Sequence, residues 1–379
     1  MAGELALSCA GQEGRPCGQG AGAAAELDAA AGHGGSAAGA VRLVARTGRG
    51  SDRNTALAVE RAHLDLALGP LGVELGRDVL ALDPAAHTQL GWSSNPPPLD
   101  HLRLSTTRPL AVSQHLTARA RYVLGRLAAP QTYPGDLVSI ARAQLELDGW
   151  LAIGATQLLQ LGGDGAPRLG VLDFVLEHVR RRDASAGASD SSNRRVGLDF
   201  AAQIDGFGGA RISYQLMFED LRTRIADALR HDADHVLGFE TRWLTVEWHR
   251  TGVRSYEHTP RTTGFTSDGR IAGDPLGPDA EAVYVAGRIA ARTAVVVPWA
   301  EFAVLGSDTY RFEDEAIVVT GRRPAELRLR LGAAIRLALG HGLALAPEAA
   351  VEDVERTAFV PGARRVNALA RAVLEWRPP

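Results

Sequence analysis

The sequence predicts an all-β protein dominated by antiparallel strands, and three observations support this fold class. Many segments alternate apolar and polar residues with a period of two, which is typical of strands with one apolar and one polar face. Turn signals rich in glycine, proline and aspartate separate these segments. Aromatic residues stand near the ends of several segments, at Tyr122, Trp150, Tyr214, Trp243, Trp248 and Tyr284.

The N-terminal residues 1–55 show the weakest pattern. Residues 21–40 are rich in alanine and glycine, which predicts either thin strands or an N-terminal arm. Cys9 and Cys17 flank a turn-like segment, so they either pair across a hairpin or remain two free thiols. No basic start followed by a long apolar run is present, so no export signal is visible in this sequence.

Two hairpins show the alternation most clearly. Residues 62–68 and 71–76 alternate on either side of the Gly69–Pro70 turn. Residues 196–204 and 211–219 do the same around the glycine-rich turn 205–209. Near the C-terminus, residues 327–339 and 366–376 also read as strands.

Three segments depart from this pattern. Residues 171–182 have helical spacing and a basic end, which predicts a short helix in a loop or plug. Residues 184–192 are small and polar and predict a flexible loop. Residues 243–285 open and close as strands around a long polar loop that is hinged by glycines. A loop of this length is usually functional or disordered.

The polar face of the predicted strands allows two architectures. It is either the lumen of a barrel or the exterior of a soluble sandwich. Strands of about ten residues and aromatic residues at strand ends favour a barrel that crosses a membrane. In a barrel, we expect the charges of this face to form mutual ion pairs rather than a transport path. The face contains Asp65, Glu74, Asp199, Arg211, Glu219, Glu247, His249, Arg328, Arg330 and Arg336.

Composition excludes several classes of protein. The 379 residues carry a formal net charge of -3, which gives no reason to expect nucleic acid as a partner. Hydrophobic residues make up 45% and charged residues 22%, so the chain is not disordered as a whole. No uncharged apolar run is long enough for a transmembrane helix.

Three groups of residues follow one another in a distinctive order along the chain. The first is a Gly-Arg strand end, a Ser-Asn-proline-rich segment and a later Arg-Pro. The second is a Glu-Asp strand end, and the third is the long loop from residue 247 onward. The positions concerned are Gly76, Arg77, Asn95, Arg108, Glu219, Asp220, Glu247, Gly273, Gly277 and Asp279. In this order, the three groups resemble the Wzi-type capsule assembly family of bacterial outer-membrane barrels.

The resemblance implies one antiparallel transmembrane barrel formed by residues 1–379, with short helical and loop insertions. At about twenty residues per strand and turn, the length allows roughly 16–18 strands. The family helps to anchor or organise capsular polysaccharide as a lectin-like protein, not as an enzyme, and without a cofactor. The resemblance therefore implies outer-membrane lipid and surface polysaccharide as partners. The family's Trp-Gly-Pro-Gly turn is reduced here to residues 82–85.

Polysaccharide binding needs an apolar ring for the sugar to lie on and hydrogen-bonding groups at its edges. An acidic capsule would add a need for arginine. The long loop offers these groups in Tyr256, His258, Arg261, Asp268 and Arg270. The alternative is that these residues order the loop by pairing with each other or with the barrel wall. Trp92 and Asn95 are weaker candidates that suit the locking of a turn.

Other kinds of site find less support. His231, Asp232, Asp234 and His235 offer ligands for a divalent cation, but they fall between strands, where we expect a solvated loop and no metal. There is no nucleophile elbow and no phosphate-binding glycine loop before a helix. Two alternative functions stay open: a passive outer-membrane channel, and a soluble all-β glycan-active enzyme with paired carboxylates.

Overall fold

The computed structural model describes residues 20–376, apart from 51–55, 81, 83, 168–169, 180–191, 207–208, 220–224, 258–260, 307, 314–315 and 322–323. Cys9 and Cys17, most of the predicted loop 184–192, and the candidate residues His258 and Asp220 lie outside this description. No helix in the described part is long and apolar enough to cross a membrane.

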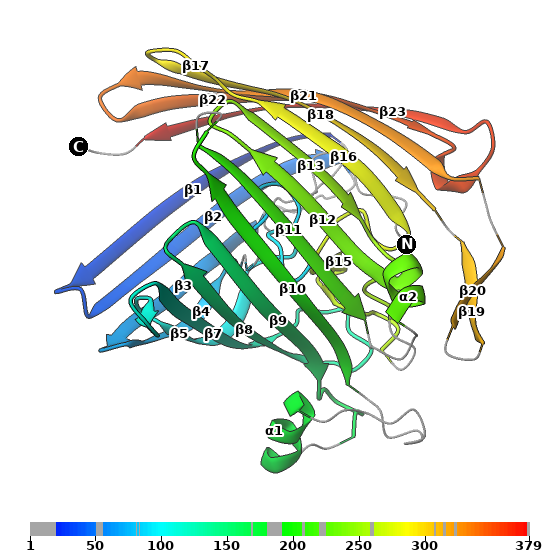
Figure 1. Ribbon diagram of the computed structural model, residues 1–379. Helices are drawn as coiled ribbons and strands as arrows, with labels where there is room; N and C mark the ends of the chain where they lie inside the picture. The colour runs from blue at the N-terminus through cyan, green and yellow to red at the C-terminus, as the bar shows by residue number, and fades with distance from the viewer. Residues whose placement is uncertain are drawn as a thin grey trace.

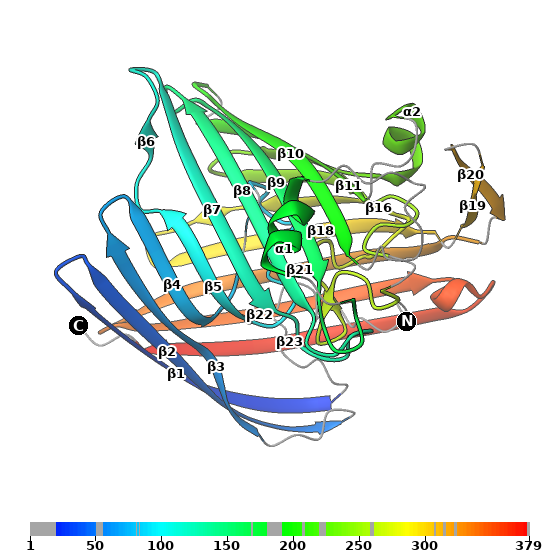
Figure 2. The same ribbon diagram turned by 90° about the horizontal axis from the view of Figure 1, so that it is seen from below.

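A single 19-stranded antiparallel sheet curls into a barrel (Figures 1 and 2). Its first strands are β1 (Gly20–His33), β2 (Ala37–Gly50), β3 (Ala56–Leu68), β4 (Leu71–Asp78), β5 (Leu99–Thr106) and β7 (Leu116–Arg126). The middle strands are β8 (Leu137–Leu147), β9 (Leu151–Leu161), β10 (Asn193–Ile204), β11 (Ala210–Glu219), β12 (Ala233–Glu240) and β13 (Leu244–Arg250). The last are β16 (Ala280–Gly287), β18 (Ala294–Leu305), β21 (Glu326–Gly340), β22 (Leu343–Glu355) and β23 (Arg364–Trp376).

Smaller elements extend this sheet or decorate its loops. β6 (Leu110–Ala111) and β17 (Ile289–Ala290) are short extensions of the sheet. Two hairpins stand apart: β14 (Thr266–Ser267) with β15 (Arg270–Ile271), and β19 (Thr309–Glu313) with β20 (Ala316–Gly321). The helical elements are α1 (Val171–Val179), α2 (Ile225–Asp227), the π-helix η2 (Ala228–Asp232) and the 3₁₀-helix η3 (Thr357–Phe359).

Each long strand pairs with its neighbours along the chain, from the β1–β2 pair to the β22–β23 pair. This order defines an up-and-down meander, the simplest topology for a barrel. Among the described residues, β1 and β23 are each hydrogen-bonded on one side only. The prediction of one large antiparallel barrel is confirmed.

Side-chain exposure on the two faces of the sheet shows that the polar residues face the interior of the barrel. On β10, the outward-facing Leu198 is 60% exposed and Phe200 39% exposed, whereas Asp199 and Arg195 face inward and are buried. Other strands repeat the pattern: Leu329 and Leu331 are exposed on β21. An apolar exterior around a polar interior is typical of membrane barrels and is the reverse of a soluble sandwich.

The two ends of the barrel differ in their connections. At the short-turn end, the connections are residues 34–36, 69–70, 107–115, 148–150, 205–209, 241–243, 288–293 and 341–342. At the long-loop end, they include residues 79–98, 127–136, 162–192, 220–232, 251–279 and 306–325. α1, α2 and the β19–β20 hairpin also lie at this end (Figure 1). In outer-membrane barrels, short turns face the periplasm and longer loops face the exterior.

Two of the long loops fold back into the barrel and form a plug there. The loop 79–98 contributes Leu80, Leu90 and Trp92 to a buried apolar cluster, and the loop 251–279 contributes Tyr256 and Phe265. The loops are joined by Ser93, whose backbone N–H donates to the carbonyl of Ala272 at 2.7 Å. The apolar core of this protein therefore lies inside the barrel and not between two sheets.

The predicted helix at residues 171–182 is present as α1, on the outer wall of the barrel and not in the plug (Figure 2). His178 attaches it to that wall. The carbonyl of His178 accepts a hydrogen bond from Gln157 of β9 at 3.1 Å, and its ring lies 2.7 Å from the Ser139 hydroxyl of β8. Nearer its N-terminal end, α1 exposes Val171, Leu172 and Val175. A helix with an exposed apolar side on this wall faces the membrane.

Candidate functional site

Tyr256 is the central anchor of the loop 251–279. Its ring packs under the guanidinium of Arg195, 3.9 Å from the guanidinium carbon to the ring centroid. Its hydroxyl donates to the carbonyl of Leu90 at 3.3 Å and accepts from the N–H of Asp274 at 2.7 Å. Burial raises the pKa of this hydroxyl far above its ordinary value, so Tyr256 stays neutral. The structure therefore places Tyr256 within the plug and away from the surface.

A buried ion-pair cluster holds this anchor to the barrel wall. Arg195 of β10 lies 2.7 Å from Glu219 of β11 and also pairs with Asp234 of β12. Glu219 accepts the backbone N–H of Tyr256 at 2.7 Å. Asp234 accepts the N–H of Gly252 at 2.8 Å. Each carboxylate thus pairs with Arg195 and fixes one backbone position of the loop, and such pairing and hydrogen bonding is how buried charges are tolerated.

The expected solvated loop at residues 231–235 is therefore a wrong prediction. Asp232 and Asp234 are both 1% exposed, since η2 and β12 carry them into the interior. Asp232 lies 2.5 Å from Arg254, and Asp234 binds Arg195. The polar residues of this segment predicted a loop, but the side chains of Asp232 and Asp234 point into the polar interior of the barrel.

Several positions of the family pattern shape the plug. Glu247 accepts the backbone N–H groups of His87 at 3.1 Å and Thr88 at 2.6 Å. Asn95 donates to the carbonyl of Ile271 at 2.9 Å, so it locks one plug loop to the other. At Gly273, a Cβ would lie 2.3 Å from the Tyr256 hydroxyl oxygen, so only glycine fits there.

The remaining positions of the family pattern lie at the ends of strands or in turns. A Cβ at Gly76 would lie 2.2 Å from the carbonyl oxygen of Ala62, and φ at Gly76 is 145°. Arg77 pairs with Asp100 on the next strand at 2.5 Å. Gly277 has a φ of 83°. Asp279 accepts the N–H of Asp308 at 2.9 Å, and burial raises the pKa of its carboxyl group. Arg108 is exposed in the turn that follows β5.

Arg261 lies buried beneath the long loops at the outer rim of the barrel. Its side chain is fully buried and lies 2.5 Å from Asp136, which precedes β8. It also donates to the carbonyl of Gly162 at 3.1 Å, and its guanidinium lies 4.9 Å from the centroid of the Tyr133 ring. The second oxygen of Asp136 accepts from Gln160 at 2.8 Å. The side chain of this buried arginine thus joins its own loop to two others.

A rim platform, defined here as Gln131–Tyr133, Thr262, Thr263, Asp268 and Arg270, lies above this buried pair. The Thr132 hydroxyl lies 3.1 Å from the Thr263 hydroxyl and 3.2 Å from that of Thr262. Gln131 donates to the carbonyl of Thr266 at 2.8 Å, which docks the β14–β15 hairpin on the loop 127–136. Asp268 is exposed on this hairpin and Arg270 is half-buried.

The structure thus divides the sequence-predicted loop residues into two groups. Asp268 and Arg270 belong to the rim platform, whereas Tyr256 and Arg261 lie buried beneath the surface. Sequence reasoning missed Tyr133 and Asp136. Their short loop carries no distinctive motif, and only a contact 125 residues away along the chain reveals their role.

Several other lumenal charges among the described residues pair with one another, as predicted. Glu301 of β18 lies 2.8 Å from both His87 of the plug and Arg330 of β21. Arg330 also lies 2.8 Å from Glu352 of β22. On the opposite wall, Arg142 of β8 pairs with Asp199 of β10 at 2.5 Å. These pairs link strands of the inner face to one another and, through His87, to the plug.

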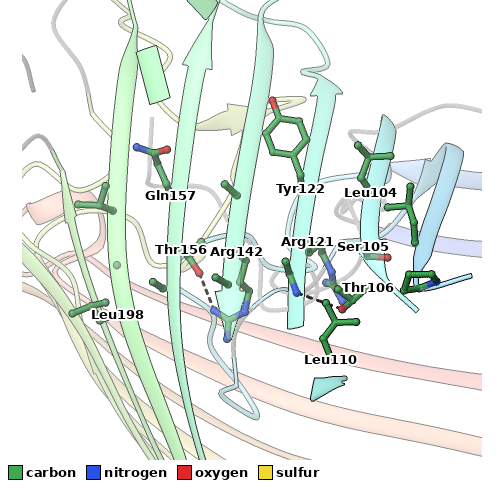
Figure 3. A pocket seen from close by; sticks show the side chains of 18 of the residues that line it. Leu104, Ser105, Thr106, Leu110, Arg121, Tyr122, Arg142, Thr156, Gln157 and Leu198 are labelled. Atoms are coloured by element: carbon green, nitrogen blue, oxygen red, sulfur yellow. Dashed lines mark hydrogen bonds between the residues drawn. The ribbon is translucent and has the colours of Figure 1, made fainter. Parts of the chain in front are cut away.

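An apolar groove with a volume of about 890 Å³ runs along the outer wall over β7–β10 (Figure 3). Its floor is formed by small outward-facing residues, and larger side chains such as Leu104 and Leu198 form its sides. The floor residues are Ala120, Ala141, Ala143 and Ala155. The groove is a feature of the lipid-facing surface, separate from the rim platform.

An apolar exterior, a paired polar lumen and an internal plug define a membrane-spanning β-barrel. The chain belongs to the family described as capsule assembly protein Wzi, whose model matches residues 4–365. Family and fold together place the protein in the bacterial outer membrane, with a role in capsule assembly.

The fold is shared with a solved structure. The chain is similar to Wzi of Escherichia coli, described as a carbohydrate-binding β-barrel involved in group 1 capsule assembly, with 13% identity and a TM-score of 0.65. That match covers 94% of this chain and 84% of the other. Pseudomonas aeruginosa OpdL is 10% identical over 94% of this chain and 92% of its own, with a TM-score of 0.48. No curated protein matches the sequence.

Proposed function

We propose that this protein is a non-enzymatic barrel that binds surface polysaccharide at its long-loop end, through the rim platform. The observation that carries the proposal is the composition of that platform. It combines a half-exposed ring, Tyr133, with threonine hydroxyls and the charged side chains of Asp268 and Arg270. These are the groups that a pyranose ring and its hydroxyl edges require.

The buried pair beneath the platform supports a binding role. Arg261 and Asp136 fix the two loops that carry Tyr133 and the β14–β15 hairpin. A surface whose backbone is fixed before binding loses less conformational entropy when a ligand binds. Arg270 offers a guanidinium to the carboxylates of an acidic polysaccharide. The family match, and the carbohydrate-binding description of the similar Escherichia coli barrel, agree with this proposal.

The experiment is to replace Tyr133 and Arg270 with alanine, separately, in the full chain. Capsule retained on the cell surface and binding of purified capsular oligosaccharide are then measured. We expect each variant to weaken oligosaccharide binding about fivefold to tenfold, since a lost stacking or charged contact amounts to roughly 1 kcal/mol. The control is Arg242→Ala, which removes an exposed arginine from the short-turn end.

Folding is checked by the shift of the band between unheated and boiled samples on a gel. Unchanged oligosaccharide binding in both folded rim variants would contradict the proposal. A porin-like function would be indicated by large conductance in planar bilayers without any loss of surface polysaccharide in a deletion strain. Turnover of the oligosaccharide by purified protein would instead indicate a glycan-active enzyme.

A further inference from the structure

We infer that the apolar groove on the outer wall is a binding site for one acyl chain of a phospholipid from the inner leaflet of the outer membrane. The site is independent of the proposed polysaccharide binding, since it lies on the opposite face of the sheet from the lumen and away from the rim platform.

The shape of the groove follows from the sizes of its side chains. Ala143 of β8 and Ala155 of β9 are register partners and face outward side by side. On one side, Leu104 and Leu110 rise above this floor, and on the other side Leu198 does so (Figure 3). Elsewhere on the exterior, larger apolar residues project into the membrane, as Leu329 and Leu331 do. A channel of small residues bordered by large ones fits a hydrocarbon chain lying along the wall.

The two ends of the groove determine which leaflet supplies the lipid. At the end nearer the long loops, Tyr122 and Gln157 line the groove, and both contact His178 of α1. The helix α1 therefore stands between the groove and the outer leaflet. At the other end, the groove reaches the short turns at Pro70 and Leu110. Because short turns face the periplasm, a lipid in the groove has its headgroup in the inner leaflet.

A cation belongs to the turn at this end of the groove. Arg108 is exposed and stands between Thr106 and Leu110, which both line the groove. The neighbouring Thr107 fixes this turn, since its N–H donates to the carbonyl of Pro70 at 2.9 Å and its hydroxyl donates to that of Gly69 at 2.8 Å. A guanidinium at the membrane surface attracts a phosphodiester group. This gives a role to Arg108, which neither the plug nor the rim platform uses.

Lipid retention by the full-length protein tests the site. The protein is purified in mild detergent, stripped of lipid, titrated with dioleoyl phosphatidylglycerol and observed by native mass spectrometry. We expect one tightly retained lipid per chain. Ala143→Trp should weaken retention about tenfold, because the indole displaces the equivalent of about two buried methylenes. Arg108→Ala should weaken it about fivefold through the lost phosphate contact.

The matched controls are Ala349→Trp, which places the same indole at an exposed position of β22 outside the groove, and Arg242→Ala. Both should retain the lipid like the unaltered protein. The inference is overturned if no lipid is retained above the level of the controls. Equal retention by folded Ala143→Trp also overturns it. Preferential retention of purified lipopolysaccharide over phosphatidylglycerol would overturn the assignment to the inner leaflet.

Discussion

Arg261 and Asp136 lie 2.5 Å apart with both side chains fully buried, although 125 residues separate them in the sequence. This pair joins the loop 251–279 to the loop 127–136 directly below the rim platform. An arginine in a polar, glycine-rich loop is thus buried beneath the proposed binding surface and joins the two loops that carry it.

Replacement of Arg261 by methionine should destabilise the protein strongly. The Asp136 carboxylate would stay buried without its partner, which typically costs about 3–5 kcal/mol. Thermal unfolding in detergent, followed by the heat-shift gel, measures the loss. The double variant Arg261→Met with Asp136→Asn should recover part of it. Equal stability of the single and double variants would show that the two side chains are not coupled.

The Arg261→Met variant should also depend on pH in a defined direction. Burial already raises the pKa of the Asp136 carboxyl above its ordinary value. A raised pKa in the folded state means that this state binds the proton more tightly, so stability is lost as pH rises from the unfolded pKa through the folded one. Without Arg261, the pKa of Asp136 in the folded state rises further, and so does the effect of pH on stability. The stability deficit of the variant relative to the unaltered protein should therefore shrink as pH falls from 7 toward about 4; a constant deficit would contradict this.

Gly273→Ala should loosen the plug. The added Cβ would lie 2.3 Å from the Tyr256 hydroxyl oxygen and 2.4 Å from the carbonyl oxygen of Leu90, so one of the two plug loops must move. Such crowding typically costs about 1–3 kcal/mol. Gly32→Ala is the control, because its Cβ meets nothing closer than 3.5 Å. Thermal unfolding of both variants compares the costs, and equal midpoints would argue against close packing at Gly273.

Glu247→Ala should open a path through the lumen. The carboxylate accepts the N–H groups of His87 and Thr88, and both would be left without this partner when it is removed. Each such lost contact costs roughly 1–3 kcal/mol, which favours release of the loop 79–98 from the wall. Single-channel recordings in planar bilayers should then show larger or more frequent conductance steps than the unaltered protein. Identical traces would mean that the plug is held elsewhere.

The sequence predicts the strands of the barrel wall well, but it predicts few of the contacts in the barrel interior. Alternation around Leu198 and Asp199 correctly assigns the two faces of β10, because each side chain direction follows from local backbone geometry. The helix at Val171–Val179 is likewise visible from its own spacing. Both features depend on residues that are close together in the chain.

The candidate site depends on contacts that no local pattern contains. The sequence leaves two roles open for Tyr256 and Arg261, sugar binding or ordering of the loop, because both belong to a polar loop. The interior of the barrel is itself polar, however, so polarity does not distinguish a buried position from an exposed one. Their partners Arg195 and Asp136 lie on other elements far away in the sequence. Only the fold of the loop into the lumen brings them together.

The Ser93 contact with the loop 251–279 also makes closure of the interior depend on both halves of the chain. Every strand pairs with its neighbours in the chain, so the wall can grow hairpin by hairpin as successive segments arrive. The carbonyls of Ala272 and Gly273 that bind the Ser93 hydroxyl follow it by 179 and 180 residues. The first half of the chain alone therefore lacks the partners of Ser93, and the interior is closed only when both halves are present.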